Sequence, residues 1–262
     1  GEITVAGKTI TATNVALGTK AYFDDSSVIK FGAEDVDGTT VTAGTLTGTI
    51  TLNDAEAGVN VTVSNDNTAA DGYEGSVTSK LSDLTVQGSG EDDAVNSDST
   101  ITIAGAGGWA VGDAAYTQDN GNLTVSADTT LAVDQDLTLS DGTFTNSGEI
   151  TVAGKTITAT NVALGGKATF VSEAGLTFGN AESAGALTVT GGTINLDNSE
   201  DEVNLTITNN KADDADAANI CGFFKALTVG QNPASSWGGG VGLAGGGVFF
   251  CTTAIRPNNH ID

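Results

Sequence analysis

Residues 1–18 read GEITVAGKTITATNVALG, and the same 18 letters return unchanged at residues 148–165. Beyond them the likeness fades, although residues 59–63 (VNVTV) still match residues 203–207 (VNLTI). A perfect match beside diverged flanks indicates a recent duplication inside a larger repetitive array. Such arrays stack similar units, and they build length and surface instead of a single reaction pocket.

Short alternating segments predict an all-β chain. A period of two between apolar residues and threonine marks a strand, and turn-forming pairs such as Asn120-Gly121 and Asp141-Gly142 stand between these segments. The pattern recurs at residues 3–5, 9–13, 49–52, 99–103, 123–125, 137–139 and 187–189.

Two all-β architectures compete, a parallel β-helix (β-solenoid) and tandem β-sandwiches. Sandwiches normally carry large aromatic core residues, whereas aromatics are only 5% of this chain. A solenoid needs only a narrow column of small apolar side chains, so the sequence favours a solenoid with coils of about 20–25 residues. We expect its inward residues to include Ile150, Val152, Ile157, Leu187, Val189 and Leu205.

A change of composition divides the chain near residue 217. Residues 1–216 contain the duplicated segment (1–67 and 148–210) and nearly all the acidic groups, so they are predicted to form an acidic β-solenoid. Residues 217–262 carry only Lys225, Arg256 and Asp262 as charged groups. We expect this near-neutral, glycine-rich segment to be either a cap on the solenoid end or an assembly element.

The C-terminal segment also holds the residues singled out as candidate sites. Cys221 and Cys251 are a disulfide candidate, with two buried free thiols as the alternative. If the segment docks one molecule onto another, the residues expected to take part are Trp237, Gly240, Val248, Phe249 and Phe250.

The net charge of −24 limits the partners of the chain. An acidic surface repels nucleic acid and anionic lipid, and no stretch reaches the ~18–20 apolar residues that span a bilayer. We therefore expect neither nucleic-acid binding nor membrane insertion. Residues 35–38 (DVDG) resemble the start of a calcium loop, but Leu46 replaces the glutamate that an EF-hand needs. Weak calcium binding stays open, and no other cofactor is expected.

Catalytic patterns are missing from the sequence. His260 is the single histidine, and the GxGxxG match at residues 240–245 lies between further glycines, where no helix can start. We therefore predict that the chain is not an enzyme. The alternative is a β-helix that binds or cleaves carbohydrate; its aromatic platforms would be Tyr73, Trp109, Tyr116 and Trp237.

Thr-x-Thr pairs such as Thr9/Thr11 and Thr188/Thr190 are typical of flat ice-binding faces. Such a face needs threonines stacked at a constant coil length. Their spacing along this sequence is irregular, so it predicts that outward threonines are ordinary strand surface.

Residues 142–154 (GTFTNSGEITVAG) resemble repeats of large secreted bacterial surface proteins, namely autotransporter passengers and filamentous-haemagglutinin-like adhesins. The resemblance covers most of residues 1–210. It implies a right-handed β-helix, export to the cell surface, and a role in adhesion or as part of a fibre or sheath. From it we expect an extracellular structural protein. The glycine-rich C-terminal segment adds the expectation that the chain associates with itself, and the carbohydrate-binding alternative makes surface glycans a further possible partner.

Overall fold

The computed structural model shows an all-β chain whose strands pair in parallel. It describes residues 1–33, 43–53, 58–68, 78–90, 92–180, 185–189, 193–197, 204–209, 229–231 and 240–244. Every pairing between strands of the described part is parallel. Tandem β-sandwiches are built from antiparallel strands, so that alternative does not fit.

The strands form four hydrogen-bonded sheets. The eight-stranded sheet contains, in spatial order, β2 (Thr9–Ala12), β5 (Ser27–Phe31), β7 (Asn60–Asn65), β10 (Thr100–Ala104), β13 (Asn122–Val125), β16 (Thr143–Asn146), β19 (Asn161–Leu164) and β22 (Ala186–Val189). The seven-stranded sheet contains β8 (Ser79–Lys80), β11 (Trp109–Ala110), β14 (Thr130–Val133), β17 (Glu149–Ala153), β20 (Lys167–Val171), β23 (Thr193–Asp197) and β25 (Val229–Gln231).

A third face combines the two remaining sheets. The six-stranded sheet contains β12 (Tyr116–Gln118), β15 (Leu137–Leu139), β18 (Thr156–Ala159), β21 (Glu173–Phe178), β24 (Asn204–Asn209) and β26 (Gly240–Ala244). The five-stranded sheet contains β1 (Ile3–Ala6), β4 (Ala21–Asp24), β6 (Leu46–Leu52), β3 (Val15–Ala16) and β9 (Leu84–Gly88). Because β9 contacts β12, the strands β1, β4, β6 and β9 continue the face of the six-stranded sheet toward the N-terminus.

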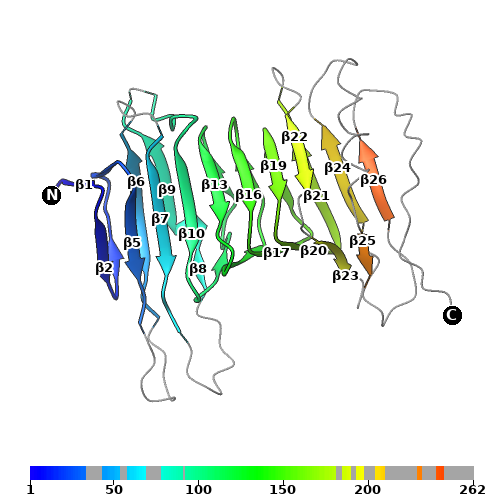
Figure 1. Cartoon of the computed structure of the whole chain (residues 1–262), viewed down its shortest axis with the longest axis horizontal. Coiled ribbons are helices and arrows are strands. Elements are labelled where there is room, and N and C mark those ends of the chain that lie inside the picture. Colours follow the sequence, from blue (N-terminus) through cyan, green and yellow to red (C-terminus); the bar gives the residue numbers. More distant parts are fainter. Residues whose placement is uncertain are drawn as a thin grey trace.

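The chain visits the three faces in turn. From β10 to β24, successive strands join the eight-, seven- and six-stranded sheets in that order, and the strand after each six-stranded-sheet strand returns to the eight-stranded sheet. We call one such circuit a coil. In Figure 1 the strands stand side by side along the long axis, from blue β1 and β2 at one end to orange β25 and β26 at the other. The arrangement is compatible with the expected β-solenoid.

Coil length varies far more than the sequence led us to expect. Glu149 lies opposite Lys167 and Asn60 lies opposite Thr100, so the second of these circuits takes more than twice as much chain as the first. Successive strands nevertheless stay in register on every face. Connections of different length between fixed strands explain this, because a longer surface loop adds little to the free energy of closing the chain.

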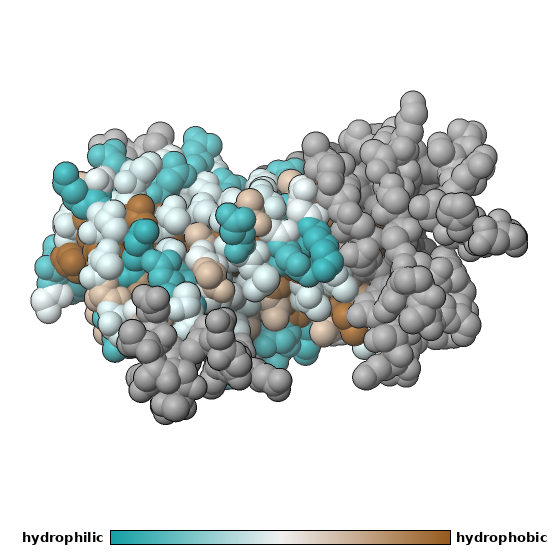
Figure 2. Space-filling model, turned by 60° about the horizontal axis from the view of Figure 1, so that its bottom comes forward, coloured by the Kyte–Doolittle hydropathy of each residue, from teal (hydrophilic) through white to brown (hydrophobic). Residues whose placement is uncertain are grey.

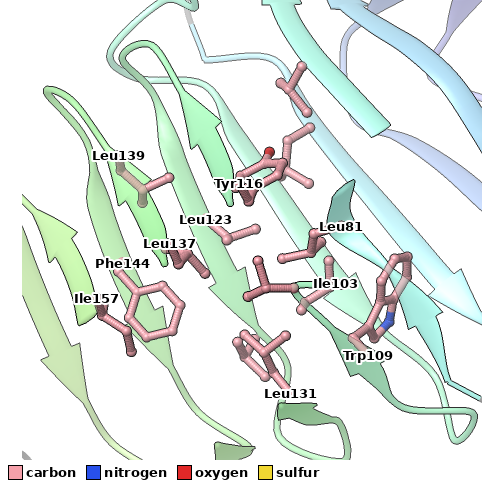
Figure 3. Packing of buried hydrophobic residues seen from close by; sticks show 14 of the residues in the cluster. Leu81, Ile103, Trp109, Tyr116, Leu123, Leu131, Leu137, Leu139, Phe144 and Ile157 are labelled. Carbon is pink, nitrogen blue, oxygen red and sulfur yellow. The ribbon is translucent and has the colours of Figure 1, made fainter. Parts of the chain in front are cut away.

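Inward side chains of the three faces fill one apolar column. Along β13 and β16 the buried and half-exposed residues alternate, with Leu123, Val125 and Phe144 pointing inward. Figure 3 shows Leu123, Leu137 and Phe144 packed together between strands of neighbouring coils. The predicted inward residues are confirmed where their side chains are described, and these are Ile150, Val152, Ile157, Leu187 and Leu205. The side chain of Val189 lies outside the described part.

Glycines let the backbones of adjacent coils meet at some corners. A Cβ atom on Gly142 would lie 1.7 Å from the carbonyl oxygen of Gly121 in the coil before it. A Cβ atom on Gly166 would lie 1.9 Å from the carbonyl oxygen of Gly148. No other residue fits at either position without moving the neighbouring coil.

The two identical segments occupy different faces. Residues Thr9–Ala12 form β2 in the eight-stranded sheet, whereas the same letters at Thr156–Ala159 form β18 in the six-stranded sheet. The eight-stranded sheet receives β19 (Asn161–Leu164) from the second copy instead. The repeated sequence therefore determines where strands and corners fall within a coil. It does not determine which of the three faces each strand joins.

Two strands extend the stack beyond residue 216. β25 pairs with β23, and β26 pairs with β24. The rest of residues 217–262 lies outside the described part, so a separate C-terminal segment stays a prediction.

Candidate interaction surfaces

Most of the candidate site residues lie outside the described part of the chain. This applies to Cys221 and Cys251, and also to Trp237, Val248, Phe249 and Phe250 of the expected assembly segment. Gly240 is described, and it begins β26, which is hydrogen-bonded to β24. The GxGxxG match thus contributes a strand to the stack at residues 240–244 instead of the turn into a helix that a dinucleotide site requires.

Two of the four expected sugar platforms are core residues. Trp109 is 2% exposed, donates from Nε1 to the carbonyl oxygen of Ala104 at 3.0 Å, and packs edge-on against Phe31. Tyr116 is 3% exposed and donates its hydroxyl to Oε1 of Gln118 at 3.0 Å. Both aromatic side chains point into the column in Figure 3. The expectation that they face a sugar is wrong, and Tyr73 and Trp237 lie outside the described part.

Carboxylates in the described part serve corners and ion pairs. Asp134 accepts the backbone N–H of Gly112, and Asp136 accepts that of Thr156, both at 2.9 Å and both from a neighbouring coil. Lys80 lies 2.7 Å from Asp113, and this hydrogen bond raises the pKa of the lysine. Among the described residues no three His, Cys, Asp or Glu side chains gather as a metal site. The calcium-like loop at residues 35–38 lies outside them.

A buried amide network that the sequence analysis missed joins three coils. Asn67 Oδ1 accepts the N–H groups of Ala33 and Gly44, and its Nδ2 donates to the Gly44 carbonyl and to Asn65 Oδ1. Asn65 Nδ2 in turn donates to the carbonyl of Gly108 at 2.7 Å. Both asparagines are at most 1% exposed. The sequence feature that could have indicated this network is a pair of asparagines two residues apart at the end of a strand.

Outward threonines stack in register across the eight-stranded sheet, contrary to the expectation from their spacing. Thr102 lies opposite Thr62 on one side and opposite Thr124 on the other. This holds although many more residues separate Thr102 from Thr62 than from Thr124. The row continues through the next three strands as Thr145, Ala163 and Thr188. A second row beside it consists of Asn60, Thr100, Asn122, Thr143, Asn161 and Ala186.

This threonine face carries no charge over six strands. The outward residues of β7, β10, β13, β16, β19 and β22 are Thr, Asn, Ser or Ala, in a chain with 33 acidic residues. Thr62, Thr102, Thr124 and Thr145 are half-buried by their neighbours, and their hydroxyl groups have no hydrogen-bond partner in the described part. In the view of Figure 2 most of the described surface is teal or white, with hydrophobic residues only in small patches.

The first coil exposes apolar side chains that its identical interior copy buries. Ile3 is 43% exposed and is the large hydrophobic side chain left exposed in the described part, whereas Ile150, at the same place in the second copy, is 0% exposed. Ile10 and Leu17 are only partly buried, whereas Ile157 and Leu164 are at most 1% exposed. The sequence is the same, so the difference comes from the coil that covers the second copy on its N-terminal side.

Comparisons with known proteins give no match. No family model matches the chain, and neither a curated protein nor a solved structure is detectably similar to it. The described residues contain no helix of the length and apolarity needed to cross a membrane.

Proposed function

We propose that the chain is a parallel β-solenoid and serves as a structural segment of an extracellular fibre, sheath or adhesin. The observation that carries the proposal is the continuity of the stack. From β10 to β24 each of the three faces adds one strand per coil, and the buried apolar residues of the described part form one cluster that reaches from Val5 to Ile207. Every coil then stabilises its neighbours. Such a stack suits a rod that acts as a spacer or that displays a binding surface away from the cell.

Localisation and shape together test this proposal. Immunogold labelling of native cells should place the protein outside the cell, and electron microscopy of the purified chain should show a rod. The strand spacing of about 4.8 Å sets the length of that rod. Label confined to the cytoplasm, or a round particle, would contradict the proposal.

Binding or cleavage of carbohydrate stays a prediction with weaker support. The burial of Trp109 and Tyr116 removes two of its four aromatic platforms. The proposal therefore assigns no reaction to the chain. A glycan array probed with the full chain would reveal a surface-glycan partner directly.

The threonine face supports a second candidate function, binding to ice. In the first row, Thr62, Thr102, Thr124, Thr145 and Thr188 place hydroxyl groups on five of six strands that lie about 4.8 Å apart. The second row, about 6.7 Å away along the strands, carries hydroxyl groups only at Thr100 and Thr143. Each hydroxyl can donate one hydrogen bond and accept two, and β-branching holds threonine in few rotamers. An uncharged row of this kind suits a ligand that is itself an uncharged lattice of water.

Ice recrystallisation assays test the second candidate. We expect the chain to inhibit recrystallisation, and the double substitution Thr124→Lys/Thr145→Lys to abolish the effect by placing two charges on the face. The matched control is Thr151→Lys/Thr169→Lys, an equally half-buried outward pair in register on the seven-stranded sheet. Loss of activity in both double variants, or no activity in the unmodified chain, would exclude this candidate.

A further inference from the structure

A half-exposed tyrosine lies on the outer side of β4. Tyr22 is the one aromatic side chain in the described part of the chain that is not buried. Burial alternates along β4, so Phe23 points into the column and Tyr22 points outward. The strand neighbours of Tyr22 are Thr4 of β1 and Thr51 of β6. The ring thus lies on a side of the stack, where its exposure does not depend on what lies beyond either end.

The second copy of the duplicated segment has no aromatic residue at the equivalent place. Residues 20–24 (KAYFD) continue the first copy, and residues 167–171 (KATFV) continue the second. The inward alanine and phenylalanine are the same, and they are buried in both copies. The two outward residues differ, because Tyr22 and Asp24 stand where the second copy has a threonine and a valine. Packing of a coil therefore requires neither side chain, which favours a role for both at the surface.

Hydrogen-bonding groups surround the Tyr22 ring. Asp24 follows Tyr22 by two residues, so it lies on the same side of β4, about 6.7 Å further along the strand. Its Oδ1 accepts a hydrogen bond from Nδ2 of Asn53 at 2.6 Å. A carboxylate has about four acceptor sites, so this bond leaves acceptor capacity for the donors of a ligand. Gln87 of β9 stands in the row of Tyr22, beyond Thr51.

An aromatic ring beside a carboxylate and amides suits a neutral sugar. The C–H groups on one face of a pyranose ring pack on an aromatic face, which is apolar and carries partial negative charge. The sugar hydroxyl groups donate to the carboxylate, and they exchange hydrogen bonds with the amide groups. Sugars with carboxylate or sulfate groups fit poorly, because Asp24 and the net charge of −24 repel them.

We propose that Tyr22, Asp24 and Asn53 form a binding site for a neutral pyranose sugar. Tyr22 is the stacking platform, and the bonded pair of Asp24 and Asn53 binds the hydroxyl groups. This deepens the proposed function and rests on it, because it names the class of ligand that an adhesin of this shape would hold. Tyr22 takes the place of Trp109 and Tyr116, the expected platforms that are buried in the column.

An array of neutral, sialylated and sulfated oligosaccharides, probed with the full chain, tests the class of ligand. We expect binding to neutral members that end in a pyranose ring and little binding to the charged members. Binding confined to the charged members, or no binding at all, would overturn the inference.

Titration with the neutral glycan that binds best on the array tests the platform. Tyr22→Thr introduces the residue of the second copy and should raise the Kd roughly tenfold or more, because the ring is lost. Tyr22→Phe keeps the ring and should change the Kd by less than about threefold. The matched control is Thr117→Ala, at an exposed position of β12, which should bind like the unmodified chain. Equal Kd values for Tyr22→Thr and the unmodified chain would exclude this site.

The carboxylate is tested separately. Asp24→Asn can still accept the hydrogen bond of Asn53 but loses the charge, so its Kd should rise about threefold to tenfold. An unchanged Kd would contradict the role given to Asp24. Urea midpoints check that each variant is folded, and Tyr22→Thr should unfold close to the unmodified chain. Rods outside the cell that bind no glycan would sink this inference and leave the proposed function standing.

Discussion

Single buried amides hold the irregular parts of this stack together. The side chain of Asn67 forms hydrogen bonds with two N–H groups and one carbonyl group of another coil. It therefore takes the place of backbone hydrogen bonds beyond the ends of the strands. Asn146 takes an inward position between Val125 and Leu164 but is less well satisfied. Its Nδ2 donates to the carbonyl of Lys167, while its Oδ1 has no partner in the described part. Polar residues in the column are therefore tolerated where they bind a neighbouring coil.

Removing the Asn67 amide should destabilise the fold strongly. Asn67→Ala leaves the buried N–H group of Gly44 and the partly buried N–H group of Ala33 without their acceptor, and a buried group of this kind costs about 1–3 kcal/mol. We expect the free energy of unfolding, measured with urea, to fall by about 2–4 kcal/mol. Asn60→Ala is the matched control, because Asn60 is exposed and, among the described residues, its side chain donates only to the nearby Gly58 carbonyl. Similar losses in the two variants would contradict this account.

Alkaline pH should unfold the chain through Tyr116. Burial raises the pKa of this phenol above the ordinary value of about 10. The fold favours the neutral form, so the stabilisation is complete below about pH 10 and is lost as the pH rises above it. Tyr116→Phe should flatten the fall in the urea midpoint above this pH, at a cost of about 1 kcal/mol for the lost hydrogen bond to Gln118. An unchanged pH profile would argue against it.

At the scale of the strand, the alternation of apolar and polar residues was sufficient to predict where strands lie in the sequence. It was not sufficient to predict which strands become neighbours in the sheets. Residues 100–103 and 137–139 are strands as predicted, because apolar residues at every second position of the sequence correspond to the side chains that are buried. The threonine face was missed because its partners, such as Thr62 and Thr102, are set by loop lengths that leave no periodic mark. The burial of Trp109 was missed for a related reason: the apolar side chain that it meets, Phe31, lies far away in sequence.

The duplicated strands allow one substitution to be compared in two settings. Ile150→Ala empties a fully buried site and should cost about 2–5 kcal/mol. Ile3→Ala changes the same residue between the same sequence neighbours, but its side chain is 43% exposed, so it should cost less than about 1 kcal/mol. Urea unfolding at concentrations where the chain is monomeric measures both. Equal losses would show that the first coil is covered in solution.

Across the whole molecule, burial of the apolar column stabilises the fold, whereas repulsion within the strongly negative surface destabilises it. The net charge of −24 is opposed in the described part by few ion pairs, among them Lys80 with Asp113 and Lys167 with Glu149. Exposed pairs of this kind contribute little, so the column has to outweigh the mutual repulsion of the carboxylates. The all-β class and the excess of acidic groups followed from the sequence, whereas the partners of the surface did not.

Salt should therefore stabilise the chain. About 1 M NaCl shortens the Debye length to about 3 Å, which screens the repulsion between surface carboxylates. We expect the Tm to rise with NaCl and to level off once screening is complete. Calcium and magnesium chlorides at equal ionic strength form the control for cation binding. A rise specific to calcium would reveal the weak site that the acidic sequence left open, and a fall in NaCl would contradict the charge argument.

The exchange of faces between the two identical segments has a consequence for how such a gene lengthens. A copied stretch of DNA that encodes one circuit need not be inserted in phase with the three faces, since the same strand sequence forms β2 on one face and β18 on another. We expect replication slippage that copies a whole circuit to yield a longer product that still folds. Heritable variation in the length of the molecule is accordingly expected among close relatives of this chain, with whole circuits gained or lost as units.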